Sequence, residues 1–133
     1  MGTNFYWLPS PCPTCGHGER LHIGKSSAGW TFALHVAAQD WEAEEGLPRD
    51  LDGWRALWAR PGSRIVDEYG ATLTPEEMNA RITQREWRRS AAFDYASNSA
   101  VPGPNGLVRH RVDGVHCIGH GEGTWDLIAG VFS

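Results

Sequence analysis

Two short segments near opposite ends of the chain each carry a pair of residues that bind soft metal ions. The first is Cys12-Pro13-Thr14-Cys15-Gly16 and the second is Cys117-Ile118-Gly119-His120-Gly121. In both segments two residues separate the pair and a glycine follows it. A tight turn of this kind aims two side chains at one tetrahedral ion, and glycine lets the backbone fold back toward them. Together the turns supply the ligands of a structural Zn²⁺ site: Cys12, Cys15, Cys117 and His120.

The fourth ligand has alternatives in the sequence, because His17, His22 or His110 could replace His120. The competing interpretation is that the cysteines are ordinary buried residues. Three cysteines cannot all pair within one chain, whereas the metal site uses all of them. Four protein ligands would leave no open position for water or substrate, so we expect the metal to stabilise the fold and not to catalyse.

Composition predicts one folded domain over residues 1–133. Apolar residues make up 41% of the chain, and seven tryptophans are among them, which is enough to build a core. No segment approaches the roughly 20 apolar residues that span a bilayer, and the start of the chain lacks a signal-peptide pattern. We therefore expect a cytoplasmic protein. The net charge of −4 predicts no general attraction to nucleic acid or to an anionic membrane.

The order of local signals predicts an α+β fold, with an antiparallel sheet built from hairpins and one or two helices. Between Trp30 and Val36 apolar residues alternate with others, as in a half-buried strand. The remaining strands are expected at 3–8, 21–24, 64–68, 71–73, 107–112, 115–118 and 124–132. The acidic segment 40–52 predicts a solvated loop or a frayed helix, and 98–106 a linker or ordered loop.

The sequence indicates where two helices begin. Asp50 or Asp52 can cap a short helix that holds Trp54 and Trp58 on one face, where core packing explains them. Thr74, followed by Pro75 and then by Glu77, forms a capping box and predicts a helix from Pro75 to about Ser90.

Near the C-terminus, Asp113-Gly114 predicts a two-residue hairpin turn between strands 107–112 and 115–118. In this register His110 lies directly across from Cys117 on the apolar side of the hairpin.

Other functions have weaker signals. The segment Gly24-Lys25-Ser26 resembles the end of a phosphate-binding loop, but Glu19 occupies the position of the required first glycine, so we expect no nucleotide site. One wedge of the second predicted helix carries a basic stripe that either binds nucleic acid or is a solvated face: Arg81, Arg85, Arg88 and Arg89. A small metal-dependent hydrolase or nuclease could use an acidic and histidine cluster near the metal: His116, His120, Glu122 and Asp126. Their spacing does not indicate which residue would act as nucleophile, which as base, and which would orient the base.

Several segments resemble small proteins of unknown function encoded by tailed bacteriophages and prophages. They are the start 1–6, the Cys-Pro-x-Cys-Gly turn, Leu21-His22-Ile23-Gly24-Lys25-Ser26-Ser27 with the residues up to Trp30, 67–70 and 120–127. The resemblance implies a phage accessory protein in a bacterial cytoplasm and carries no activity. We expect a non-enzymatic protein that binds a macromolecule of the host or phage, most readily a protein.

Overall fold

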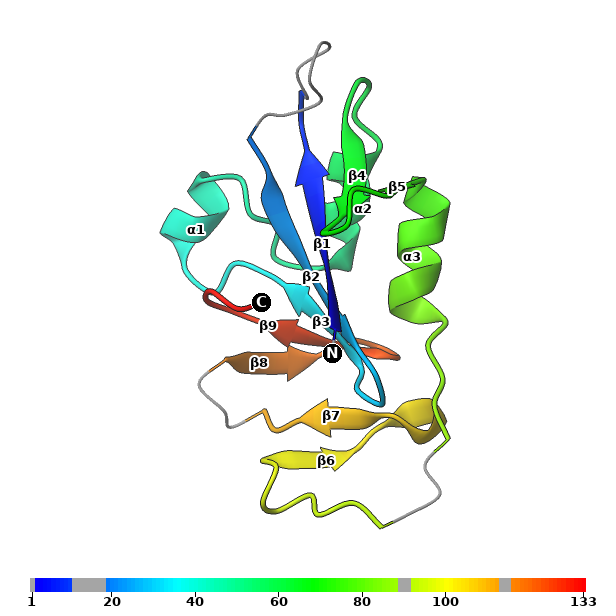
Figure 1. Ribbon diagram of the computed structural model, residues 1–133. Coiled ribbons are helices and arrows are strands. Elements are labelled where there is room, and N and C mark those ends of the chain that lie inside the picture. Colours follow the sequence, from blue (N-terminus) through cyan, green and yellow to red (C-terminus); the bar gives the residue numbers. More distant parts are fainter. Residues whose placement is uncertain (1, 11–18, 89–91, 113–115) are drawn as a thin grey trace.

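The computed structural model describes residues 2–10, 19–88, 92–112 and 116–133. These residues form a mixed α+β fold around a mostly antiparallel sheet with the strand order β5-β4-β1-β2-β3-β9-β8 (Figure 1). Its strands are β1 (Gly2–Leu8), β2 (Leu21–Ser27), β3 (Phe32–His35), β4 (Arg64–Asp67), β5 (Thr72–Leu73), β8 (Cys117–His120) and β9 (Trp125–Ile128). A separate ribbon pairs β6 (Ala100–Pro102) with β7 (Val108–His110), and the helices are α1 (Asp40–Glu44), α2 (Leu51–Trp58), α3 (Pro75–Thr83) and a 3₁₀ turn at Pro104–Gly106.

The part of the sheet formed by residues 2–73 follows the predicted hairpins. β2 pairs antiparallel with β3, and β4 with β5, while β1 lies between β2 and β4. β2 is longer than predicted, because Lys25 and Ser26 continue the ladder with β1. The local alternation of side chains was therefore sufficient to locate these strands.

The C-terminal strands differ from the prediction. β9 enters the sheet parallel to β3, and β8 pairs with β9. The predicted hairpin between 107–112 and 115–118 is wrong, because β7 pairs instead with β6, a strand inside the predicted linker 98–106. Both edges of β7 are already bonded: the His110 N–H donates to the Asp126 carboxylate over 2.9 Å, and the N–H of Arg111 donates to the carbonyl of Ser99. The predicted turn, Asp113-Gly114, lies outside the described residues.

Both predicted helix caps are confirmed. The Asp50 carboxylate accepts the N–H of Gly53 at the start of α2, and Thr74 forms the capping box of α3. However, α3 ends at Thr83, well before residue 90, because Arg85 turns away to donate to the backbone carbonyls of Ser27 and Trp30. The acidic segment 40–52 forms the short α1, which has no buried residue, and the first residues of α2.

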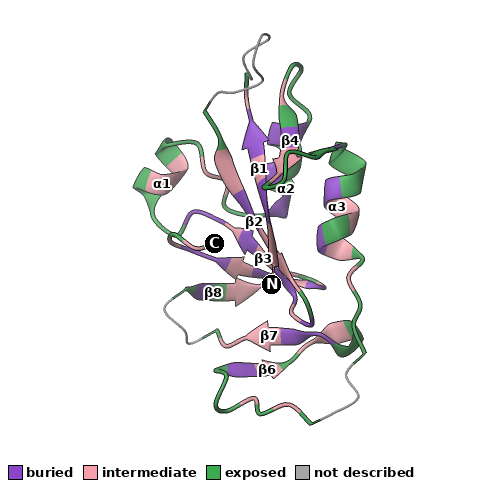
Figure 2. Ribbon diagram, viewed as in Figure 1, coloured by how far each residue is buried: buried purple, intermediate pink, exposed green. Residues whose placement is uncertain are grey.

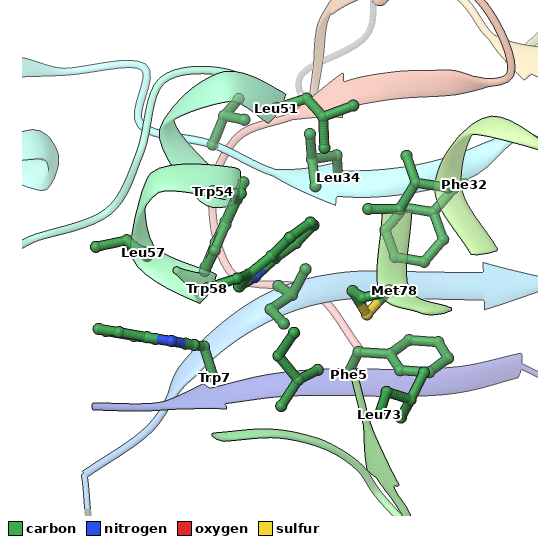
Figure 3. Close-up of a cluster of buried hydrophobic side chains, with 14 residues drawn as sticks. Phe5, Trp7, Phe32, Leu34, Leu51, Trp54, Leu57, Trp58, Leu73 and Met78 are labelled. Atoms are coloured by element: carbon green, nitrogen blue, oxygen red, sulfur yellow. The ribbon is translucent and has the colours of Figure 1, made fainter. Parts of the chain in front are cut away.

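The core lies between one face of the sheet and the helices α2 and α3. Figure 2 shows the buried sides of these helices, and Figure 3 shows the side chains that meet there. The two tryptophans of α2, Trp54 and Trp58, pack in this cluster as predicted. Sheet residues at alternating positions complete it, among them Phe5, Trp7, Ile23, Phe32, Leu34 and Ile65.

The opposite face of the sheet is polar. Because successive side chains of a strand point to opposite faces, Asn4 and His35 lie on the reverse of the core strands, and Asp126 does so on β9. β7 of the ribbon contacts this face where Arg109 and His110 bond Asp126. Within the described residues no helix is both long and apolar enough to cross a membrane.

Candidate metal centre

Asp126 organises the polar face near β8. Its side chain is fully buried and accepts hydrogen bonds on both oxygens. Oδ1 accepts hydrogen bonds from Nε of Arg109 at 2.9 Å and from Nδ1 of His120 at 2.6 Å. Oδ2 receives the hydroxyl of Thr31 at 2.9 Å and both the backbone N–H and Nδ1 of His110, at 2.9 and 3.0 Å. The hydrogen bonds of the Asp126 carboxylate thus connect β9 to β7, to β8 and to the start of β3.

The donors keep this carboxylate ionised. Burial alone would raise the pKa of Asp126, but hydrogen bonds from His110, His120 and Thr31 outweigh it and lower the pKa to about 2. The neighbouring guanidinium of Arg109 is also well anchored, since its Nη2 donates to the carbonyls of Gly123 and Trp125. The buried charge of Asp126 is therefore paired and hydrogen-bonded.

The contact with Asp126 fixes the tautomer of His120. Because the ionised carboxylate can only accept, Nδ1 of His120 carries the proton and Nε2 keeps its lone pair. A histidine that donates one ring N–H to a carboxylate and offers the other nitrogen is the usual arrangement of a metal-ligating histidine.

Cys117 lies beside His120 and is buried, with 3% of its surface exposed. Ligand atoms of Cys117, His120 and Asp126 all lie within 4.8 Å of one another, so the group could hold a metal ion. Burial raises the pKa of the Cys117 thiol, and the charge of Asp126 raises it further. Without a metal this cysteine is a protonated thiol and a poor nucleophile.

The backbone after His120 is held close to this group by Trp125. Gly121 N–H donates to the carbonyl of Trp125. A Cβ on Gly121 would lie 1.9 Å from Nε1 of the Trp125 indole, so a larger residue would displace the ring. Glycine at this position lets the chain turn tightly between β8 and β9.

The structure brings together two of the four predicted ligands, Cys117 and His120. The other two, Cys12 and Cys15, lie outside the described residues, as does the alternative ligand His17. His110 bonds Asp126 through Nδ1 as His120 does, but it is not among the residues whose ligand atoms lie within 4.8 Å of one another, and His22 lies on β2 with Asn4 as its partner.

The chain around the first cysteine turn joins the end of β1 to the start of β2. β8 lies four strands from β1 and three from β2, or about 14 to 19 Å across the sheet at the usual strand spacing. In Figure 1 the end of β1 is at the top of the view and β8 is in the lower half. Experiments on the predicted four-ligand site should therefore test its two halves separately.

Sequence reasoning named Asp126 only as a member of an acid/base cluster and did not identify its role or its partners Arg109 and Thr31. The available signal was an acid between Trp125 and Leu127 in an otherwise apolar strand. Such a residue, if buried, requires donors from other parts of the chain. His116, from the same predicted cluster, is exposed.

The predicted basic stripe is not one helical face. Arg81 lies on α3, but Arg85 follows the end of the helix and is partly buried against the β2–β3 turn, where it also bonds the Ser26 hydroxyl. Arg89 lies outside the described residues. The stripe therefore gives little support to nucleic-acid binding.

Comparison of the chain with protein-family models, with curated proteins and with solved structures gives no match.

Proposed function

We propose that this protein is a zinc-stabilised module that works by binding a host or phage protein. The observation that carries the metal part of the proposal is the 2.6 Å contact from His120 Nδ1 to a buried carboxylate, beside the buried thiol of Cys117. The phage context rests on the sequence resemblance alone.

The ligands we assign are the Cys117 thiolate and Nε2 of His120. Asp126 accepts five hydrogen bonds, which use the roughly four lone-pair sites of a carboxylate, so it positions His120 and does not bind the ion. Zinc binding would deprotonate Cys117 and replace the energetic cost of a buried thiolate with a metal–sulfur bond. We propose Cys12 and Cys15 as the other two ligands on the basis of their spacing.

A binding role is favoured over nucleophilic catalysis by Cys117. Cys117, His120 and Asp126 have the residue types of a catalytic triad, but the thiol is buried and its pKa is raised, whereas a nucleophilic cysteine needs a lowered pKa and access to substrate.

Two tryptophans on the surface, Trp41 and Trp87, expose 60% and 43% of their area. Exposed tryptophans are frequent anchors of protein interfaces.

Metal content per chain tests the first part of the proposal. Untagged wild-type protein should carry one zinc that Cys117→Ser and His120→Gln each lose, while His116→Gln, an exposed histidine nearby, should keep it. Cys12→Ser and Cys15→Ser test the other half of the ligand set. If they retain the metal, the four-ligand site is wrong and Cys117 and His120 bind the ion with other groups. If wild-type protein binds no zinc, the proposal fails.

Capture of a partner tests the second part. Wild-type protein at micromolar concentration should retain a specific protein from bacterial lysate, with or without phage infection, and Trp41→Ser or Trp87→Ser should weaken retention at least several-fold. Glu76→Ser, an exposed change on α3, is the matched control. No reproducible partner under either condition would contradict a binding role.

A second candidate, a metal-dependent hydrolase or nuclease, is favoured by one feature. His120 and Glu122 border a cavity of about 420 Å³ whose other wall carries Asp50, Asp52 and Arg55. Catalysis would require an open metal position facing this cavity. Cobalt-substituted protein with a four-coordinate spectrum that is unchanged by added phosphate, together with no cleavage of a phosphodiester substrate, would exclude this candidate.

A further inference from the structure

Two histidines that do not contact Asp126 through any hydrogen bond of the described residues form a second cluster on the polar face. His22 on β2 and His35 on β3 have ring centroids 5.3 Å apart. The C-terminal Phe132 packs edge-on against both rings, at 4.8 and 5.3 Å. The end of the chain thus returns to β2 and β3, near α1 (Figure 1).

The hydrogen bonds of the two rings leave one lone pair free on each. His22 Nε2 donates to the side-chain carbonyl of Asn4 over 2.8 Å, so its Nδ1 is unprotonated; this atom is buried and has no partner among the described residues. His35 Nδ1 donates to the backbone carbonyl of His22 over 3.1 Å, so its Nε2 is unprotonated. Each imidazole is oriented by a carbonyl in the way that metal-ligating histidines usually are.

We propose that His22 and His35 bind a divalent transition-metal ion such as Zn²⁺, at a site distinct from Cys117 and His120. The spacing of the rings fits this role. Two imidazole nitrogens about 2.0 Å from one tetrahedral ion hold their ring centroids about 5 Å apart, and the centroids of His22 and His35 are 5.3 Å apart.

The remaining coordination positions face a cavity. His22 and His35 both border a cavity of about 500 Å³, which Glu42 and Glu45 of the α1 region also line. Glu42 accepts the amide N–H groups of Ala38 and Gln39 through Oε1, and among the described residues no third His, Cys, Asp or Glu has a ligand atom close enough to form a group with the two rings. Water would therefore complete the coordination of the ion.

The charges around the pair are balanced. Arg20 and Lys25 oppose a cation, but the guanidinium of Arg20 stacks on Tyr6 at 4.1 Å and Lys25 Nζ donates to the carbonyl of Ser133. Glu42 and Glu45 contribute negative charge from the other wall. Burial, followed by the neighbouring positive groups, lowers the pKa of His22 to about 4, so the ring is neutral and able to ligate at pH 7.

Titration of metal-free protein with Co²⁺ separates the two sites. A cysteine site gives a sulfur-to-cobalt charge-transfer band, whereas a site of histidine and water ligands gives only weaker visible bands. We expect a second equivalent of Co²⁺ to bind without a charge-transfer band, and His22→Gln and His35→Gln to weaken it at least ten-fold. Cys117→Ser should abolish only the charge-transfer band, and His116→Gln should affect neither site.

A second measurement leaves both histidines unchanged. Substoichiometric Cu²⁺ added to chelator-treated Cys117→Ser protein, and separately to wild type, should broaden the ring proton resonances of His22 and His35 in the nuclear magnetic resonance spectrum before those of His116. Equal broadening of all histidines, or a second Co²⁺ equivalent that survives both glutamine variants, would overturn the proposal. Failure here leaves the Cys117 site untouched, because that site has its own spectroscopic band.

Discussion

The two faces of the central sheet are stabilised in different ways. On the face toward α2 and α3, completely buried apolar side chains such as Phe32, Leu34 and Trp54 contribute through the area they remove from water. On the other face, near β8, Asp126 accepts hydrogen bonds from three parts of the chain, at Thr31, at Arg109 and His110, and at His120. The first kind of stability is spread over many contacts and tolerates conservative changes, whereas the second depends on one group.

Replacement of Asp126 with Asn should give the largest effect. The change leaves Arg109 without its counter-charge in a buried site, which typically costs about 3 to 5 kcal/mol of unfolding free energy. Urea denaturation in the presence of a chelator measures this cost without the contribution of metal.

The control is Asp52→Asn, which removes an exposed ion pair with Arg55 at 2.9 Å. Its cost should stay below about 1 kcal/mol. If Asp126→Asn cost as little as this control, the polar face would not depend on its central carboxylate.

On the apolar face, Leu34→Ala should lower the unfolding free energy by about 2 to 5 kcal/mol, because it leaves a cavity in a close-packed core. Met78→Leu, at an equally buried position, conserves volume and should cost less than about 1.5 kcal/mol. Equal losses from the two variants would show that this face, too, is held by specific contacts.

The pH dependence of stability should also come from the polar face. Burial lowers the pKa of His22 from 6.5 to about 4. Between these values the unfolded chain binds a proton that the folded chain does not, so stability should fall as the pH drops from about 6.5 to about 4. The lowered pKa of His35 acts in the same direction.

Denaturation midpoints of metal-free wild type and His22→Gln at several pH values check this prediction. The variant should have a flatter profile in this window. Below it, both proteins should lose further stability as the pH falls from 3.8 toward 2, since the pKa of Asp126 is lowered to about 2. Parallel profiles above pH 4 would show that His22 does not control the acid sensitivity.

The sequence predicted the apolar face better than the polar one, for a physical reason. Side-chain alternation in 30–36, the cap at Asp50 and the capping box at Thr74 are local signals, and they located strands and helix starts correctly. The predicted end of α3 was wrong, because Arg85 donates a hydrogen bond to a turn that is distant in the sequence.

The candidate site was partly predictable. The turn spacing found Cys117 and His120, which the structure places together. The turn spacing could not show that the Asp126 carboxylate accepts the N–H of His110, a bond that prevents the predicted hairpin. That bond joins two strands whose sequences carry no recognisable pairing signal. The parallel pairing of β9 with β3 likewise joins residues that are far apart in the sequence, so no local signal predicts it.

That parallel pairing has a consequence for the order of synthesis on the ribosome. β9 is inserted between β3 and β8, and its residues 125–128 are made after those of the other strands of the sheet. The strands from β5 to β3 can pair as soon as residue 73 has emerged, but the edge of β3 stays open until residues 125–128 follow. Asp126 and both histidines bonded to it therefore come together only after the strands β5 to β3 can form their part of the sheet.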